Sequence, residues 1–113
     1  MEVERVIMNT DYEHIEVKNN EDEQRYEMKL DEHIAILVYE REGNTITFLH
    51  TEVPPALEGH GVANKLAHSA LEDARTQALT VVPLCPFVAS YIRHHPEYLS
   101  LLTESERARL QRG

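Results

Sequence analysis

Two glycines stand one residue apart in LEGHGVANKL, residues 57–66, directly before a stretch with helical spacing. The first amide groups of a helix have no intrahelical acceptor and carry a partial positive charge, so a helix N-terminus can hold a phosphate that the backbone approaches closely. Gly59 and Gly61 lack the β-carbons that would hinder this approach. A simple turn with close helix packing is the alternative for an isolated G-x-G. The pair therefore makes this loop the first candidate for a phosphate site.

The surroundings of the glycine pair narrow the class of ligand. The pair follows a predicted strand and opens a long predicted helix, but it lacks a third glycine and the N-terminal strand of a dinucleotide-binding fold. Nicotinamide and flavin cofactors are therefore not expected.

Cys85 is the only cysteine of the chain and immediately precedes Pro86. Pro86 suits the first turn of a helix, which places Cys85 at the N-cap, where the helix dipole would favour a thiolate. Such a thiol could act as a nucleophile, or as a proton donor or packing group, and a buried inert cysteine is the alternative. A single cysteine also excludes an internal disulfide and suits a reducing compartment.

His50 is the candidate acid–base group. It lies on a predicted strand, 45–53, where strict alternation would put it on the same face as Ile46 and Phe48, with Glu52 next. An imidazole titrates near neutral pH and can accept a proton. The alternative is a partly buried histidine bonded to a backbone carbonyl.

A second group of basic side chains lies at Arg93, His94 and His95. Adjacent histidines on a helix point about 100° apart, and no carboxylate or cysteine is suitably spaced, so no metal site is expected. At the end of a predicted helix these groups would offset the dipole.

The elements that must position these residues follow from hydrophobic periodicity. Four segments rich in β-branched and aromatic residues read as antiparallel strands at 14–18, 25–30, 34–40 and 45–53, with turn chemistry at 19–22. Helices are predicted at 62–78, 86–95 and 103–112, the last with a Thr103/Glu106 capping box, and a short strand at 79–84. A right-handed crossover would lay strand 79–84 parallel to strand 45–53, which makes a mixed sheet. Pro83 would weaken pairing at its end.

Composition bounds the class of protein. The 113 residues suffice for one domain, read as an N-terminal segment 1–12, a domain 13–102 and a helical tail 103–113. No apolar run approaches the roughly 20 residues of a membrane span, and no signal peptide is recognisable, so a cytoplasmic protein without a membrane partner is expected. A net charge of -9 without a basic cluster argues against nucleic acid and would attract cationic partners.

Two segments, HTEVPPALEGHGVANKLAHSALEDAR and VVPLCPFVASYIRHHPEY, together resemble the small single-domain branch of the GNAT superfamily of acetyl-CoA-dependent N-acetyltransferases. The resemblance covers about 14–102 and is strongest over 50–98. It implies an α/β (α+β) fold with a mixed, mostly antiparallel twisted sheet and no pair of early helices. It also implies that the fourth strand splays from the fifth and that the pantetheine arm of coenzyme A enters the opening.

The resemblance also implies site residues. The pyrophosphate loop would comprise Gly59, His60, Gly61, Val62, Ala63 and Asn64, with Val53 and Lys65 as further coenzyme contacts and Arg93 or His94 near the adenosine end. Glu58 departs from the Arg or Gln usual in the superfamily, so binding would rest on backbone amides. The missing early helices leave the acceptor side open, which suits an exposed amine on a protein.

Forming an amide from an acetyl thioester needs a base for the amine, stabilisation of the oxyanion and protonation of the thiolate. His50 is the preferred base, Cys85 is second, and Tyr91 or Tyr98 would be the general acid by resemblance. The sequence therefore predicts transfer of acetyl from acetyl-CoA to a primary amine, with a protein lysine or N-terminus as one acceptor class. The alternative is a catalytically weak module of the same fold that binds coenzyme A or another protein.

Overall fold

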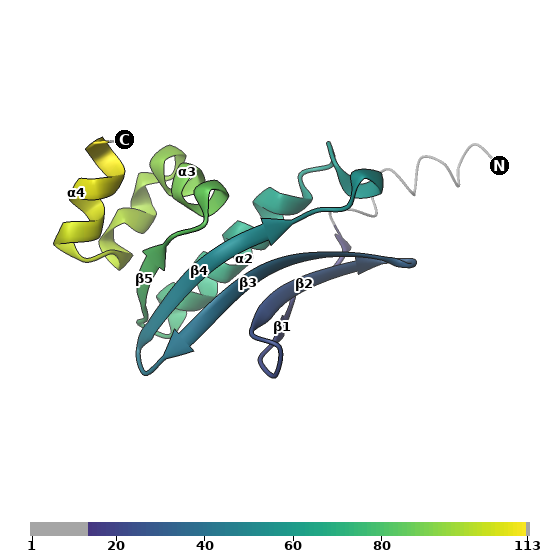
Figure 1. The fold of residues 1–113 in the computed structure, drawn as a ribbon, viewed down its shortest axis with the longest axis horizontal. Helices are drawn as coiled ribbons and strands as arrows, with labels where there is room; N and C mark the ends of the chain where they lie inside the picture. The colour runs from purple at the N-terminus through teal and green to yellow at the C-terminus, as the bar shows by residue number, and fades with distance from the viewer. Residues whose placement is uncertain (1–13, 113) are drawn as a thin grey trace.

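The computed structural model describes residues 14–112, so the predicted segment 1–12 lies outside the described part of the chain. The elements are β1 (Lys18–Asn20), β2 (Arg25–Leu30), β3 (His33–Glu42), β4 (Thr45–Glu52), η1 (Pro55–Leu57), α2 (Val62–Thr76), β5 (Thr80–Pro83), α3 (Pro86–His94), η2 (Pro96–Leu101) and α4 (Glu104–Arg112). The strands form one sheet in the order β1-β2-β3-β4-β5 (Figure 1). The first three pairings are antiparallel and β4–β5 is parallel, which confirms the predicted mixed sheet.

The first strand differs from its prediction. It was expected at 14–18 with a turn at 19–22, but β1 spans Lys18–Asn20 and the turn occupies 21–24. Asparagine has low β-propensity, yet Asn19 accepts a hydrogen bond from Tyr39 Oη at 2.6 Å and Asn20 donates to Glu27 at 2.9 Å. These bonds to other strands hold two asparagines in β1. The local sequence pattern does not predict the strand, because the bonding partners lie elsewhere in the chain.

The two faces of the sheet have opposite character. One, which we call the covered face, carries the buried side chains of the strands: Tyr26, Met28, Ala35, Leu37, Tyr39, Ile46, Phe48 and Val81. Helix α2 lies behind this face in Figure 1, while α3 and α4 gather beside β5. The buried residues of α2 and α3 belong to the same hydrophobic cluster, so one core lies between the covered face and the helices.

No helix of the described chain covers the opposite side of the sheet in Figure 1, which we call the open face. The strand register assigns to it the following residues: Lys18, Arg25, Glu27, Lys29, Ile34, Ile36, Val38, Glu40, Thr47, His50 and Glu52. A sheet with one packed and one solvated face is typical of antiparallel strands.

A β-bulge in β4 corrects the predicted placement of His50. Tyr39 pairs with Phe48, but the next residue back on β3, Val38, pairs with His50, so Leu49 is an extra residue in β4. One inserted residue reverses the alternation that follows. His50 consequently lies on the open face and not with Ile46 and Phe48, while Thr51 turns to the covered face.

The parallel pairing between β4 and β5 ends at Phe48 and Pro83. The last paired residues are Phe48 and Pro83, and the Cys85 amide donates to Phe48 O at 2.8 Å. Strand β4 continues to Glu52 without β5 beside it, because the chain turns into α3 after Pro83. The strands therefore stay paired up to Pro83 and separate only beyond it.

The C-terminal part of the chain joins the same core. The 3₁₀ helix η2 was not predicted, and its Tyr98 is 1% exposed. Thr103 caps α4 as expected, because its hydroxyl accepts the Glu106 amide at 3.1 Å. The Glu106 carboxylate pairs with Arg109 at 2.7 Å. Leu110 is 1% exposed, so α4 packs into the main cluster.

Candidate functional site

The loop before α2 adopts a conformation that requires glycine. Gly59 and Gly61 have φ angles of 83° and 74°, a left-handed region that side chains disfavour. A β-carbon at either position would meet nothing within 4 Å, so the space beside the loop is open. Gly61 is the N-cap of α2, and its carbonyl accepts the first helical bond, from Lys65 N at 3.0 Å. The preceding amides of the first turn have no acceptor within the helix.

A cavity of about 160 Å³ lies against these amides. Its lining residues are Val53, Leu57, Glu58, Gly59, Gly61, Val62, Ala63, Asn64 and Phe87. The structure thus brings together Val53 from the end of β4, the predicted loop residues and one side chain of α3. His60, Lys65 and Arg93, which were also predicted to contact the coenzyme, are not among the residues of 14–112 that line it.

The feature of the cavity that can attract an anion is the backbone at the start of α2, and not a basic side chain. Its lining contains the carboxylate of Glu58 and no lysine, arginine or histidine among residues 14–112. The positive end of the α2 dipole is therefore the favourable feature for an anion there. Arg93 is engaged elsewhere, since its Nε donates to Leu110 O at 2.9 Å.

Cys85 lies at the point where β4 and β5 separate, and on the covered side of the sheet. It is the N-cap of α3, as predicted, but its side chain forms no capping bond. Cys85 is 1% exposed, and its Sγ lies 3.3 Å from Thr51 Oγ1. The thiol is therefore buried next to the separating strands and partnered by a hydroxyl.

His50 and Glu52 form an exposed pair on the open face. The distance from His50 Nε2 to Glu52 Oε2 is 2.9 Å, and the side chains are 52% and 64% exposed. When Nε2–H donates to the carboxylate, Nδ1 carries the lone pair that can accept a proton. This arrangement suits a base that solvent or a polymeric substrate can reach directly.

Tyr91 lies on α3 and is not among the described residues that line the cavity. Its ring stacks on His95 with centroids 4.0 Å apart and lies 6.2 Å from Tyr98. Burial, followed by the charges of Glu97 and Glu72, raises the pKa of Tyr91 above its ordinary value. The hydroxyl therefore keeps its proton at neutral pH. The ring is partly buried against the core.

Tyr98 is held in a network of its own. Its hydroxyl donates to Glu72 at 2.5 Å, and burial followed by that bond raises its pKa. Arg75 pairs with the same carboxylate at 2.6 Å. Tyr98 thus ties η2 to α2, which is a packing role.

Sequence reasoning missed two neighbours of the site. Regular alternation from Ile46 and Phe48 would put Thr51 on the face opposite to them, and the bulge that turns it inward has no local signal. Phe87 follows Pro86 at the start of α3, a position from which a large side chain can reach the α2 N-terminus. Its place after the proline was the available sequence signal.

Comparisons with known proteins agree with this geometry. The family model of the GCN5-related N-acetyl-transferases matches residues 25–101, more than half of the chain. The chain belongs to the GCN5-related N-acetyltransferase family. The resemblance inferred from the glycine loop and from segment 81–98 is thereby confirmed.

Individual relatives show how far the similarity extends. Protein NATD1 of Mus musculus is 38% identical over 60% of this chain and 64% of its own, and NATD1 of Xenopus tropicalis is 35% identical over 60% and 65%. The matched part thus spans less than two thirds of these relatives. The solution structure of a GCN5-like protein from Staphylococcus aureus superposes with a TM-score of 0.62 at 27% identity, covering 79% of this chain and 88% of that one.

Within residues 14–112, no group of three or more His, Cys, Asp or Glu side chains is arranged to hold a metal ion. Over the same residues, none of the helices has the length and apolar character needed to cross a bilayer.

Proposed function

We propose that the protein is an acetyl-CoA-dependent N-acetyltransferase that moves acetyl to a primary amine, with a lysine or N-terminus of a polypeptide as acceptor. The observation that carries the proposal is the cavity at the N-terminus of α2, where two glycines with positive φ leave the first helical amides open beside separating strands. Family membership supports the same reaction class.

The coenzyme would bind through its diphosphate at the Gly59–Asn64 amides, with the pantetheine arm running past Val53 into the gap beyond Phe48. The cavity volume of about 160 Å³ suits an arm and not a whole coenzyme, so the adenosine would lie at the surface. The carboxylate of Glu58 would repel an anionic ligand and so weaken its binding at this loop. We therefore expect affinity that rests on the backbone and on apolar contact with Phe87.

In the transfer step the amine nitrogen attacks the acetyl carbonyl, a carbon–nitrogen bond forms and the carbon–sulfur bond breaks. His50 would accept the proton of the amine through Nδ1, while Glu52 holds Nε2–H. The departing sulfur takes a proton from Tyr91 or from water. The coenzyme leaves as a thiol, and the charge of the reactants is conserved.

Cys85 could instead accept the acetyl group first and pass it to the amine. Its Sγ is buried and bonded to Thr51, which favours a proton donor or packing group over a nucleophile. Intact-protein mass spectrometry with acetyl-CoA and no acceptor separates the two routes. Direct transfer predicts no acetyl on Cys85 and substantial turnover by Cys85→Ala.

The overall proposal is tested by calorimetry with coenzyme A and by thiol release from acetyl-CoA with a panel of amines and peptides. Wild type should release coenzyme A in the presence of an acceptor, and His50→Ala should lower kcat by about 10²-fold or more. Absence of heat at millimolar coenzyme A would refute the coenzyme site.

A catalytically weak module that binds coenzyme A or another protein is the second candidate. The placement of Glu58 at the cavity favours it. Tight coenzyme binding without turnover that depends on His50 would support this alternative. We propose a cytoplasmic location in either case, because acetyl-CoA and a reduced Cys85 are compatible there.

A further inference from the structure

The open face carries an uneven distribution of charge around His50. His50 and Glu52 lie on β4, whereas β1 and β2 carry Lys18, Arg25 and Lys29 together with the buried Glu27. Ile34, Ile36 and Val38 of β3 form a half-buried apolar strip between the two groups. In a chain with a net charge of -9, the lysines and arginine on one side of the face make a local exception.

Of the three cations on β1 and β2, the two lysines are the ones that a ligand can still pair with. Arg25 is committed to Glu27, with Nε 2.7 Å from the carboxylate, and Asn20 donates to the same oxygen. Lys29 lies 3.9 Å from the other oxygen of Glu27 and is 68% exposed, and Lys18 forms no ion pair within residues 14–112. Lys18 and Lys29 therefore retain charge for a ligand.

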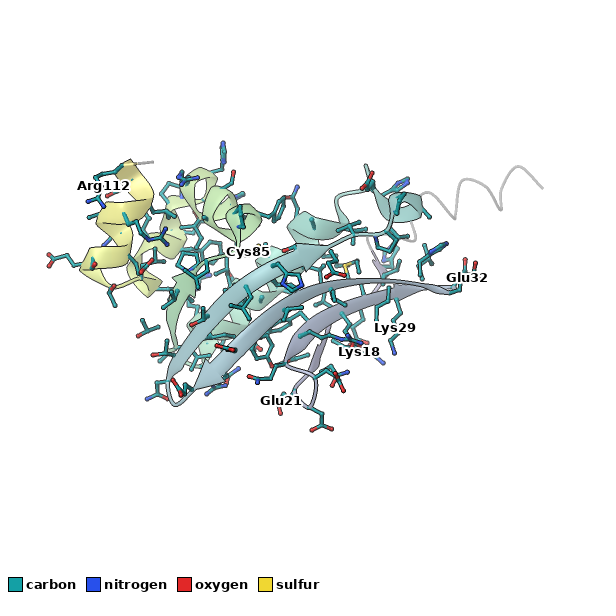
Figure 2. All side chains as sticks on the ribbon, in the orientation of Figure 1. Lys18, Glu21, Lys29, Glu32, Cys85 and Arg112 are labelled. Carbon is teal, nitrogen blue, oxygen red and sulfur yellow. The ribbon has the colours of Figure 1, made fainter. Side chains whose placement is uncertain are left out.

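Lys18 and Lys29 share one hollow. They border a cleft of about 290 Å³ together with Ile15, Glu16 and Glu27. Figure 2 shows both lysines at the β1–β2 side of the sheet, far from Arg112 on α4. The lining also contains the carboxylates of Glu16 and Glu27, and Glu27 is already paired with Arg25. An acidic side chain that reached this cleft would meet the two ammonium groups beside Ile15.

The two charged groups belong to one continuous surface. In the register, Arg25, Val38 and His50 lie in one row across three strands, and Glu27, Ile36 and Glu52 lie in the next. The pKa of Arg25 is raised first by its hydrogen bond to Glu27 and also by the charge of Glu52 across β3. No helix of the described chain lies in front of β2, β3 and β4 in Figure 1.

Strand geometry gives the span between the groups. Lys29 lies two strands and four residues from His50, so spacings of about 4.8 Å between strands and about 3.3 Å per residue put their Cα atoms roughly 16 Å apart. An extended peptide covers that distance in about five residues. A chain lying over the apolar strip would thus connect the two groups.

We propose that the open face binds the acceptor as an extended polypeptide whose lysine reaches His50 and whose carboxylate, about five residues away, pairs with Lys18 and Lys29. The inference rests on the proposed acetyl transfer and adds the charge pattern of its substrate. It contrasts with the preference for purely basic peptides that the overall charge of the chain would give.

The test uses N-terminally acetylated peptides of about eleven residues with one central lysine as the only amine. One aspartate is placed two to seven positions from the lysine on either side, and the reference peptides carry serine or arginine there. The aspartate peptide with a spacing near five should have a KM about two- to fivefold lower than the serine peptide, with kcat unchanged, as expected for exposed charge pairs. The advantage should shrink as salt rises.

Charge reversal supplies the decisive comparison. Lys18→Glu/Lys29→Glu should remove the aspartate advantage and favour the arginine peptide, whereas Arg112→Glu on α4 should behave as wild type. Both variants change exposed side chains, and calorimetry with coenzyme A serves as their check of folding and of the coenzyme site.

Three outcomes are distinguishable. Turnover that depends on aspartate spacing and is reversed in the double variant supports the inference. Turnover that is insensitive to aspartate, or a preference for arginine peptides that Lys18→Glu/Lys29→Glu leaves unchanged, overturns it while the acetyltransferase assignment stands. Failure of every amine and peptide in wild type refutes the proposed function and the inference with it.

Discussion

The covered and open faces of the same sheet differ in what their residues can do. On the covered face, Phe48 is 0% exposed and Cys85 is 1% exposed, and Thr51 partners the thiol. On the open face, His50 and Glu52 are more than half exposed and lie two strands from an arginine–glutamate–lysine cluster. Packing holds the first set, and charge pairing in solvent holds the second. Solvent reaches His50 and Glu52 of the second set directly.

The bulge at Leu49 connects this contrast to function. Without the extra residue, the alternation of β4 would bury His50 and expose Thr51. With it, the imidazole stands on the open face within the row of Arg25 and Val38, while the hydroxyl points to Cys85. A single inserted residue thus divides the two candidate catalytic groups between the faces.

The largest effect should come from the core of the covered face. Phe48→Ala should lower the free energy of unfolding by about 3–5 kcal/mol, because a fully buried ring leaves a cavity. Val38→Ala, on the half-buried strip of the open face, should lower it by only about 1 kcal/mol. Urea denaturation followed by circular dichroism measures both. Equal losses would show that the open face is packed in solution.

Glu27 tests whether charge pairing stabilises the open face. Glu27→Gln should cost about 2 kcal/mol at pH 7, because the carboxylate is 5% exposed and bonded to Arg25 and Asn20. The hydrogen bond from Arg25, offset by burial and helped by Asn20, lowers the pKa of Glu27 below its ordinary 4.5.

A lowered pKa means that the stabilisation from Glu27 is complete above pH 4.5 and is lost as pH falls through the folded-state value. The difference between wild type and Glu27→Gln in urea denaturation should therefore be largest at pH 7 and shrink toward pH 3. Glu40→Gln, an exposed change on the same face, should leave stability nearly unchanged. A difference independent of pH would contradict a role for the charge.

Substitutions at two glycines distinguish the effect of backbone strain on stability from an effect on ligand binding. Gly61 and Gly43 both have positive φ, 74° and 57°, and neither has an atom within 4 Å of a β-carbon position. Gly61→Ala and Gly43→Ala should each cost about 1–2 kcal/mol of stability. Calorimetry should show weaker coenzyme A binding only for Gly61→Ala. Parallel losses of affinity would mean that the α2 N-terminus does not hold the diphosphate.

The smallest effect should come from the hydroxyl beside the thiol. Thr51→Val keeps the shape of the side chain and removes the hydrogen bond to Cys85, so stability should fall by less than about 1 kcal/mol. Alkylation of the native thiol by iodoacetamide should stay slow, because burial limits access. Thr47→Val on the open face is the matched control and should be nearly neutral. Rapid alkylation of the wild-type protein would show that the Cys85 thiol is accessible in solution and would contradict its burial.

Much of the fold could be predicted from sequence because the relevant signals are local. The apolar stripe of α2, the prolines around β5 and the alternation of β2 each depend on residues within a few positions. The Gly59/Gly61 loop was predictable for the same reason, since positive φ is a property of the residue itself. Thr103 likewise marked the start of α4 by its own hydroxyl.

The sequence by itself therefore determined the order of the strands and α-helices, the glycine loop before α2 and the N-cap position of Cys85. Only the tertiary structure decided that Asn19 and Asn20 form a strand, that His50 faces solvent and Thr51 faces the thiol, and that Lys18 and Lys29 share a cleft. The physical reason is that register, bulges and side-chain pairing depend on residues brought together from different strands, and neighbours along the chain carry no information about those partners.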